Sequence, residues 1–192
     1  MLEDAGHLAL IVGGCVRNAV LGETVSDIDV ATDARPERVS DLAERVGFRV
    51  IPTGIDHGTV SVVAQGVVHE VTTFRRDVQT DGRHAVVAFS GRVEEDAARR
   101  DFTMNALYAD ARGDVIDPLG GLPDLLARHL RFVGDAETRI AEDYLRVLRF
   151  FRFFAHYGNG RPDADGLRAC AQARSKLSTL SAERVWAETK KL

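Results

Sequence analysis

The strongest constraint on the fold of this chain is a strand, a glycine turn and a helix in direct succession near its start. Residues 8–12 (LALIV) form a short apolar run, Gly13 and Gly14 follow it, and residues 15–22 (CVRNAVLG) have the spacing of a helix that ends at a glycine. Bare amides at the start of a helix bind phosphate well, and Arg17 in the first turn is placed to reach the same anion. Alone, such a turn is more often structural, because it lacks the G-x-G-x-x-G spacing and the P-loop lysine.

Two carboxylates share one face of the next predicted strand, which covers residues 26–32 (SDIDVAT). Side chains at positions i and i+2 of a strand project to the same side, so Asp27 and Asp29 lie together. Aspartate is a poor strand former, and like charges at this spacing repel each other. Because Mg²⁺ prefers carboxylate oxygens, the pair predicts a divalent metal site, and the plain alternative is an exposed edge strand. Asp33, beyond the strand, is predicted to cap the following helix.

The chain continues with helix and strand patterns typical of a mixed α+β domain. Residues 35–47 predict a helix whose apolar face carries Val39, Leu42 and Val46. Residues 77–92 look like a loop. Strands are predicted at 48–52, 58–66 and 67–74. A long helix is predicted at 93–110, and a short strand with a closing turn at 113–121.

From residue 134 onward the pattern becomes purely helical. Predicted helices cover 136–158, 164–177 and 181–192, and the chain stops within the last of them. This ending favours a chain that is one piece of a longer protein.

The first of these helices carries a charged stripe, in which polar side chains recur at every third position: Asp143, Arg146, Arg149 and Arg152. The intervening side chains are predicted to form its apolar face: Leu145, Leu148, Phe151 and Phe154. The plain alternative is a solvated charged surface.

Charge is distributed unevenly along the chain. Residues 1–130 carry 13 Lys and Arg against 21 Asp and Glu, whereas residues 131–192 carry 12 against 8. This division suits a carboxylate-rich metal site followed by a segment that meets phosphates, although two solvated surfaces of different composition would also produce it. Since no apolar run approaches about 18 residues, a membrane protein is not expected. Cys15 and Cys170 are predicted to be reduced thiols of a cytoplasmic protein.

Five motifs occur in a fixed order along the chain: GGCVRN, SDIDVATD, HEVTTFRRD, RRDFTMNALYAD with VIDPLGG, and EDYLRVLRFFRF. Together they closely resemble the class II tRNA nucleotidyltransferases (CCA-adding enzymes) and the related bacterial poly(A) polymerases. The resemblance extends from about residue 10 to the end. It implies a nucleotidyltransferase head of the polymerase-beta type over 1–133, with a mixed sheet and flanking helices, followed by an all-α neck over 134–192.

The resemblance implies roles for the polar residues of the head. Asp27 and Asp29 take the place of the two carboxylates that hold catalytic Mg²⁺, and Glu70 that of a supporting carboxylate. The triphosphate is expected to contact Gly13, Gly14, Arg17, Arg99 and Arg100.

Two further polar residues of the head have open roles. Asp101 is as well suited to hold an arginine in place as to touch substrate, and Asn105 is a supporting or packing residue. Asn18 is a departure from the family, because most relatives have Asp there; no metal role is assigned to it. His57 and His69 are interpreted as structural.

In the neck, the resemblance implies that the charged stripe selects the incoming base. A carboxylate such as Asp143 accepts a hydrogen bond from the amino group of C or A, and Arg146 donates to ring acceptors on the same edge. U and G present a carbonyl oxygen there and would be repelled. Arg149 and Arg152 are expected to contact phosphate or to support nearby helices.

The implied activity is metal-dependent addition of CMP and AMP, from CTP and ATP, to the 3′ end of tRNA. Addition of CC only, addition of A only, and poly(A) synthesis share these motifs and stay open as alternatives. A nucleotide-binding module that lacks the parts gripping tRNA is a further alternative. A metal-dependent phosphohydrolase built on the same carboxylates is the alternative outside the family.

Overall fold

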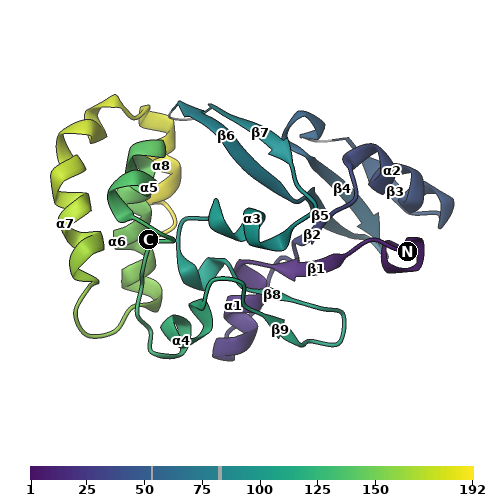
Figure 1. The fold of residues 1–192 in the computed structure, drawn as a ribbon, viewed down its shortest axis with the longest axis horizontal. Helices are drawn as coiled ribbons and strands as arrows, with labels where there is room; N and C mark the ends of the chain where they lie inside the picture. Colours follow the sequence, from purple (N-terminus) through teal and green to yellow (C-terminus); the bar gives the residue numbers. More distant parts are fainter. Residues whose placement is uncertain (53, 82–83) are drawn as a thin grey trace.

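The computed structural model describes residues 1–52, 54–81 and 84–192, and it has an α/β part joined to a group of helices (Figure 1). Within these residues a seven-stranded sheet has the order β3-β4-β5-β2-β1-β8-β9. The β2–β5 pair is parallel and the others are antiparallel, which confirms the predicted α+β class. The strands are β1 (Ala9–Val12), β2 (Val30–Thr32), β3 (Arg49–Ile51), β4 (Thr59–Ala64), β5 (Val67–Thr73), β8 (Tyr108–Ala109) and β9 (Val115–Ile116).

Helices lie at both ends of the molecule, with α5 to α8 gathered at one end and α2 at the other (Figure 1). None of the helices in the described ranges is long and apolar enough to cross a membrane. The α-helices are α1 (Gly14–Leu21), α2 (Pro36–Arg45), α3 (Val93–Ala98), α4 (Gly121–Leu126), α5 (Ala136–Glu142), α6 (Leu145–Tyr157), α7 (Ala164–Gln172) and α8 (Ala182–Thr189). Short 3-10 helices cover Glu3–Ala5, Ile55–His57, Thr103–Asn105 and Ala173–Thr179.

One hydrophobic cluster joins the α/β part to the helical part. It combines side chains of α1 and of residues 102–109 with side chains of α5, α6 and α7. At its centre Phe102 packs against Phe132 with ring centroids 4.9 Å apart, and Phe132 stacks on Phe150 at 5.4 Å. These rings are fully buried, so the two parts share an apolar interior.

The strand that carries the aspartate pair is shorter than predicted. β2 begins at Val30, and Asp27 and Asp29 precede it in an extended segment. The backbone oxygen of Asp29 still accepts a hydrogen bond from the amide of Val12 at 3.0 Å, so the segment follows the edge of β1 up to the glycine turn. The predicted cap was wrong: Asp33 accepts from His7 Nδ1 at 3.2 Å and does not cap α2.

The prediction of a loop over residues 77–92 was wrong. A separate two-stranded antiparallel sheet forms there, from β6 (Arg75–Asp81) and β7 (His84–Phe89). Residues 82 and 83 lie outside the described residues. Asp81 followed by a glycine is a hairpin signal in the sequence, and the apolar run 85–89 after it is typical of a strand.

The long helix predicted over residues 93–110 was also wrong. α3 ends at Ala98, a 3-10 turn covers Thr103–Asn105, and β8 follows. The Asp101 carboxylate accepts a hydrogen bond from the adjacent amide of Phe102 at 2.8 Å, a local contact that competes with helical hydrogen bonding.

The first predicted neck helix is broken in two. Asp143, with φ −156° and ψ 107°, is extended and separates α5 from α6. Its carboxylate accepts from the amide of Leu145 at 3.1 Å and so helps to start the second helix. Asp143 therefore lies beside the start of the arginine stripe and not on the same helix.

The predicted apolar face of this helix was wrong. The buried side chains of α6 are Val147, Phe150 and Phe153, whereas Phe151 is 48% exposed. The sequence RVLRFFRFF contains two apolar rows one position apart with the same spacing, so periodicity alone does not choose between them. Val46, predicted to be buried after α2, is likewise exposed.

The corrected face of α6 is tested by two matched substitutions. Phe150→Leu is expected to lower the free energy of unfolding by about 1 kcal/mol or more, because the ring is fully buried. Phe151→Leu is expected to change it by less than about 0.5 kcal/mol. Urea denaturation of both variants measures the difference, and a larger loss in Phe151→Leu would contradict the assignment of faces.

Candidate functional site

The predicted metal-binding aspartates lie together in the structure. Asp27 and Asp29 line a cavity of about 160 Å³ that also contacts Gly14, Arg17 and Asn18. Partial withdrawal from water raises the pKa of Asp29, and the nearby carboxylates of Glu70 and Asp27 raise it further, whereas Arg100 lowers it. The net effect is a raised pKa of Asp29, caused mainly by burial and only secondarily by the two neighbouring carboxylates.

Glu70 lies on the strand beside the pair. Val30 of β2 pairs in parallel with Val71 of β5, so the residues that precede them, Asp29 and Glu70, stand at the same level of the sheet. Even so, no group of three or more His, Cys, Asp or Glu side chains gathers as a metal site within the described ranges. The two aspartates form a pair, and a ligand role for Glu70 stays a prediction.

The glycine turn brings two arginines next to the start of α1. Gly13 has φ +80°, which a side chain would disfavour, and its amide donates to the backbone oxygen of Leu107 at 3.0 Å. A Cβ on Gly13 would lie 3.4 Å from Arg100 Nη1, and one on Gly14 would lie 3.5 Å from Arg17 Nη2. Four of the five residues predicted to contact phosphate, all except Arg99, therefore lie together at this turn.

Arg17 is buried and donates hydrogen bonds to three other side chains. It is 7% exposed, and burial lowers its pKa. It donates to Asn18 Oδ1 from Nε at 3.1 Å, to Asn105 Oδ1 from Nη1 at 2.5 Å, and to the Tyr157 hydroxyl from Nη2 at 2.7 Å. Asn18 keeps the acceptor that an aspartate would offer and, through Nδ2, donates to the backbone oxygen of Thr24 at 2.9 Å.

Asp96 is a buried charged residue next to the candidate site that the sequence analysis missed. It is 1% exposed and accepts from Arg99 Nε at 2.9 Å, Arg100 Nη2 at 3.0 Å and the Tyr108 hydroxyl at 2.7 Å. Burial acts to raise its pKa, but the two arginines and the hydroxyl outweigh burial, and the pKa lies below the usual value. Its spacing of three and four residues from the arginines is a helical ion-pair signal that could have found it.

Asp101 holds an arginine of α6, one of the two roles predicted for it. Arg149 donates to its Oδ2 from Nε at 2.7 Å and from Nη2 at 2.5 Å, and Asn105 Nδ2 donates to its Oδ1 at 3.0 Å. Burial acts to raise the pKa of Asp101, but Arg149 and these hydrogen bonds outweigh it and the pKa is lowered. The carboxylate is therefore ionised and occupied within the protein.

The other residues of the charged stripe are also paired. Arg146 donates to the Glu142 carboxylate and, at 2.7 Å, to the backbone oxygen of Arg139. Arg152 donates to Glu188 at 2.5 Å. The structure therefore places these arginines in ion pairs, and their contacts with a nucleotide stay predictions.

Asp143 is paired with the last helix. Its Oδ2 accepts from Arg184 Nη2 at 2.7 Å, and both side chains are 24% exposed. A base that donates a hydrogen bond to the Asp143 carboxylate would either bind beside Arg184 or displace Arg184 from it.

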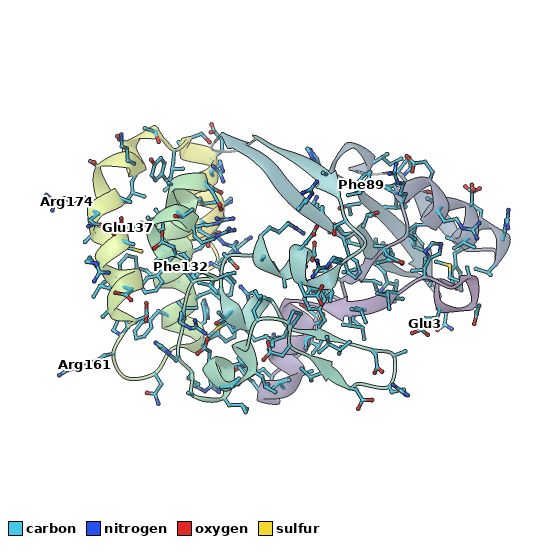
Figure 2. The ribbon with its side chains drawn as sticks, viewed as in Figure 1. Glu3, Phe89, Phe132, Glu137, Arg161 and Arg174 are labelled. Carbon is cyan, nitrogen blue, oxygen red and sulfur yellow. The ribbon has the colours of Figure 1, made fainter. Side chains whose placement is uncertain are left out.

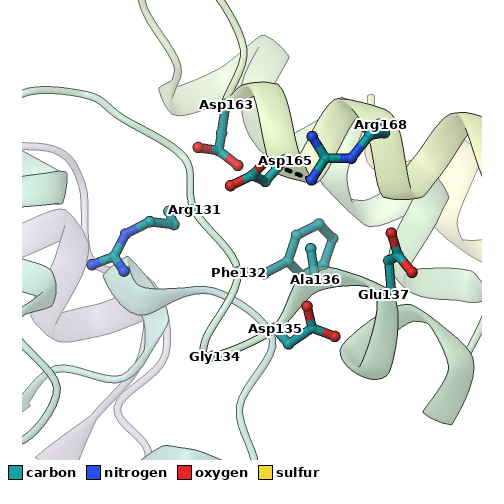
Figure 3. Close-up of a pocket in the computed structure, with 9 residues that line it drawn as sticks. All are labelled: Arg131, Phe132, Gly134, Asp135, Ala136, Glu137, Asp163, Asp165 and Arg168. Carbon is teal, nitrogen blue, oxygen red and sulfur yellow. Dashed lines mark hydrogen bonds and ion pairs between the residues drawn. The ribbon is translucent and has the colours of Figure 1, made fainter.

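A second polar cavity, of about 220 Å³, lies at the helical end (Figure 3). Two of its carboxylates cap helices, since Asp135 accepts from the amide of Thr138 at 2.8 Å and Asp163 from that of Gly166 at 2.7 Å. A third, Asp165, pairs with Arg168 (Figure 3). Local structure accounts for these carboxylates, so this cavity is not the candidate site.

Two basic side chains of the helical part lie outside these ion pairs and point outward. Figure 2 shows Arg161 and Arg174 projecting from the surface of this end, whereas Phe132 lies inside. Both arginines are exposed. These two arginines thus present positive charge to solvent at the end away from α2.

Comparisons with known proteins agree with this geometry. The family model described as the poly A polymerase head domain matches residues 9–131. The chain is 44% identical over 193 residues to the CCA-adding enzyme of Leuconostoc mesenteroides, which covers 100% of this chain and 47% of that enzyme. The chain therefore spans about half the length of the curated relatives it matches.

Two solved structures are similar over nearly the whole chain. One is the Bacillus stearothermophilus CCA-adding enzyme in complex with CTP, with 40% identity and a TM-score of 0.87, covering 99% of this chain and 45% of that one. The other is a tRNA nucleotidyltransferase complexed with a primer tRNA and an incoming ATP analog, with 29% identity and a TM-score of 0.79. It covers 98% of this chain and 53% of that one.

Proposed function

The chain belongs to the class II tRNA nucleotidyltransferase family, and from this premise we propose that it carries the nucleotide-transferring part of a CCA-adding enzyme. The proposed reaction adds CMP and AMP, from CTP and ATP, to the 3′ end of tRNA. The observation that carries the proposal is the cavity in which the aspartate pair, the glycine turn and Arg17 meet.

The aspartate pair fits the Mg²⁺ ions that this reaction requires. Asp27 and Asp29 would hold the metal, because both line the cavity and carboxylate oxygens are the ligands that Mg²⁺ prefers. Bound metal would supply Lewis-acid activation of the RNA 3′-hydroxyl and of the departing pyrophosphate. Glu70, at the same level of the sheet, is proposed as a supporting carboxylate that orients the pair.

The phosphates are proposed to bind at the glycine turn. Gly13 and Gly14 allow the backbone to approach a triphosphate closely, and Arg17 and Arg100 flank the turn with positive charge. Arg99 and Arg100 are fixed by Asp96, so they meet the nucleotide with little loss of side-chain freedom.

The base is proposed to be chosen by Asp143 and Arg146. Their present partners, Arg184 and Glu142, hold both side chains in place until a base edge competes for them. C and A carry an amino group that satisfies the carboxylate, and U and G would leave it facing an oxygen. Arg149 and Arg152 then act as helix supports, through Asp101 and Glu188.

We further propose a catalytic head over 1–133 and a helical neck over 134–192, with the tRNA 3′ end as the partner of the site. The sheet lies in the first part, and the elements that begin after residue 134 are helices in the described structure. A cytoplasmic location is part of the proposal, and two buried cysteines without a disulfide agree with it.

Nucleotide choice gives the first test. The chain is expected to bind CTP and ATP at least about tenfold more tightly than UTP and GTP, because a mismatched base leaves a buried polar group unpaired. Calorimetric titration of the four nucleotides in the presence of Mg²⁺ measures this preference. Equal affinity for all four would contradict base selection.

The reaction itself is tested with tRNA that lacks its terminal CCA. Addition of two C residues with CTP and of a final A after ATP is added supports the proposal. Growth of a long A tail would identify a poly(A) polymerase, and addition of only CC or only A would identify the narrower enzymes. Nucleotide binding without extension of tRNA would identify a binding module, and phosphate release without RNA a phosphohydrolase.

A further inference from the structure

The last turn of α6 contacts the first turn of α1 through one tyrosine. The Tyr157 hydroxyl accepts from Arg17 Nη2 at 2.7 Å, and the guanidinium carbon of Arg17 lies 3.9 Å from the centroid of the Tyr157 ring. The hydroxyl fixes an edge of the guanidinium and the ring covers its face. One side chain of the helical part thus contacts both an edge and a face of the Arg17 guanidinium.

Tyr157 belongs to a row of side chains spaced four positions apart on α6. Arg149, Phe153 and Tyr157 follow one another along this row. Phe153 packs between the other two, because its ring centroid lies 5.3 Å from the guanidinium carbon of Arg149 and 5.6 Å from the ring centroid of Tyr157. The row therefore presents one continuous surface to the α/β part.

The two ends of this row bind the same chain of polar groups. From Tyr157 the contacts pass to Arg17, then to Asn105 at 2.5 Å, then to Asp101 at 3.0 Å. Asp101 returns to α6 through Arg149. Such a closed circuit resists local rearrangement, because moving any one member breaks contacts on both sides.

Arg17 lies at the proposed reaction site. Arg17 lines the same cavity as Asp27 and Asp29, and only 7% of the residue is exposed. The side chain therefore does not reach this cavity as a free surface cation. Its direction is set by the groups that surround it.

We propose that Tyr157 is a positioning residue for the phosphate end of the nucleotide site. It holds the Arg17 guanidinium toward the triphosphate, and the helical part thereby controls phosphate affinity in the α/β part. This inference rests on the proposed function, because it assigns the anion to an incoming nucleoside triphosphate. Tyr157 touches Arg17 and not the substrate.

Tyr157→Phe tests the inference, since it keeps the ring and removes only the hydroxyl. With Mg²⁺ present, the dissociation constants of CTP and of inorganic tripolyphosphate are expected to rise about tenfold, the effect of losing one hydrogen bond to a charged group. The affinity for cytidine and the preference for CTP over UTP are expected to stay unchanged. Tyr144→Phe is the matched control, because the Tyr144 hydroxyl makes no hydrogen bond to the described part of the chain.

A merely structural role for Tyr157 predicts a different pattern. Cytidine and CTP affinity would then fall together, along with the melting temperature, and that result would overturn the inference. Unchanged tripolyphosphate affinity in Tyr157→Phe would overturn it as well. Arg17→Lys removes the guanidinium that the Tyr157 ring and hydroxyl contact. In that variant, adding Tyr157→Phe is therefore expected to weaken tripolyphosphate binding less than twofold.

Failure of the proposed function is distinguishable from failure of this inference. If the wild-type chain binds tripolyphosphate but not CTP, the proposed function fails and the tripolyphosphate comparison still decides the role of Tyr157. If the wild-type chain binds neither, both are overturned. Should Tyr157→Phe not fold, the wild-type Arg17 side-chain NMR signals decide, because a shift on adding tripolyphosphate is expected and its absence contradicts the inference.

Discussion

An Asp29→Asn variant is expected to lose nucleotidyl transfer by at least about 1,000-fold while its fold stays intact. The loss follows from removing one of two carboxylates that line the cavity, since the amide that replaces it carries no charge for a divalent cation. Primer extension with CTP and a tRNA lacking CCA measures the rate. Transfer equal to that of the wild type, with Mg²⁺ present, would exclude Asp29 as a metal ligand.

Stability gives a second readout for the same variant. Because the folded-state pKa of Asp29 is raised, the ionised carboxylate destabilises the metal-free protein above that pKa, and this penalty disappears as the pH falls below the unfolded value of about 3.9. Asp29→Asn is therefore expected to melt at a higher temperature than the wild type at pH 7 without metal. Added Mg²⁺ is expected to raise the melting temperature of the wild type only. Asp41→Asn, at an exposed position of α2, is the control.

Asp96→Asn is expected to lower the free energy of unfolding by about 3–5 kcal/mol at pH 7. The substitution leaves Arg99 and Arg100 without their buried counter-charge and weakens the contact with the Tyr108 hydroxyl. Nucleotide affinity is expected to fall with stability, because the two arginines lose the group that fixes them. Urea denaturation monitored by circular dichroism measures the change.

The pH dependence of this variant has the opposite sign to that of Asp29→Asn. The folded-state pKa of Asp96 is lowered, so its stabilising contribution is complete above the unfolded value of about 3.9 and is lost as the pH falls through the folded value. The stability difference from the wild type is therefore expected to close below about pH 4. Glu94→Gln, which removes the same charge from the exposed face of α3, is expected to cost less than about 0.5 kcal/mol. Equal losses in the two variants would contradict the role given to Asp96.

The sequence was sufficient to predict the elements whose signals are local. The glycine turn, α1 and the nearness of Asp27 to Asp29 follow from glycine conformation and from side-chain spacing, and the structure confirms them. The resemblance then supplied the family, which the comparisons confirm. Neither source identified what each arginine touches.

The missed hairpin and Asp96 have local signals in the sequence, whereas two other missed features depend on contacts between distant segments. Two apolar rows on α6 have equal periodicity, and only packing against Phe102 and Phe132 selects the row that contains Phe150. The helix break at Asp143 depends on its own side chain and on Arg184, which lies 41 positions later. A residue pattern read along one segment contains neither piece of information.

The shared aromatic cluster has a consequence for how such proteins diverge. Phe102 of the first part and Phe150 and Phe153 of the second are packed ring against ring, so exchanging everything after residue 133 with a relative would join interiors that were shaped separately. A chimera of two relatives is therefore expected to fold only if the junction leaves this cluster intact, or if compensating substitutions are made on both sides of the junction. The proposed base-selecting residues follow residue 133 and the proposed phosphate-binding residues precede it, so an exchange that separates the two sets also has to repack these rings.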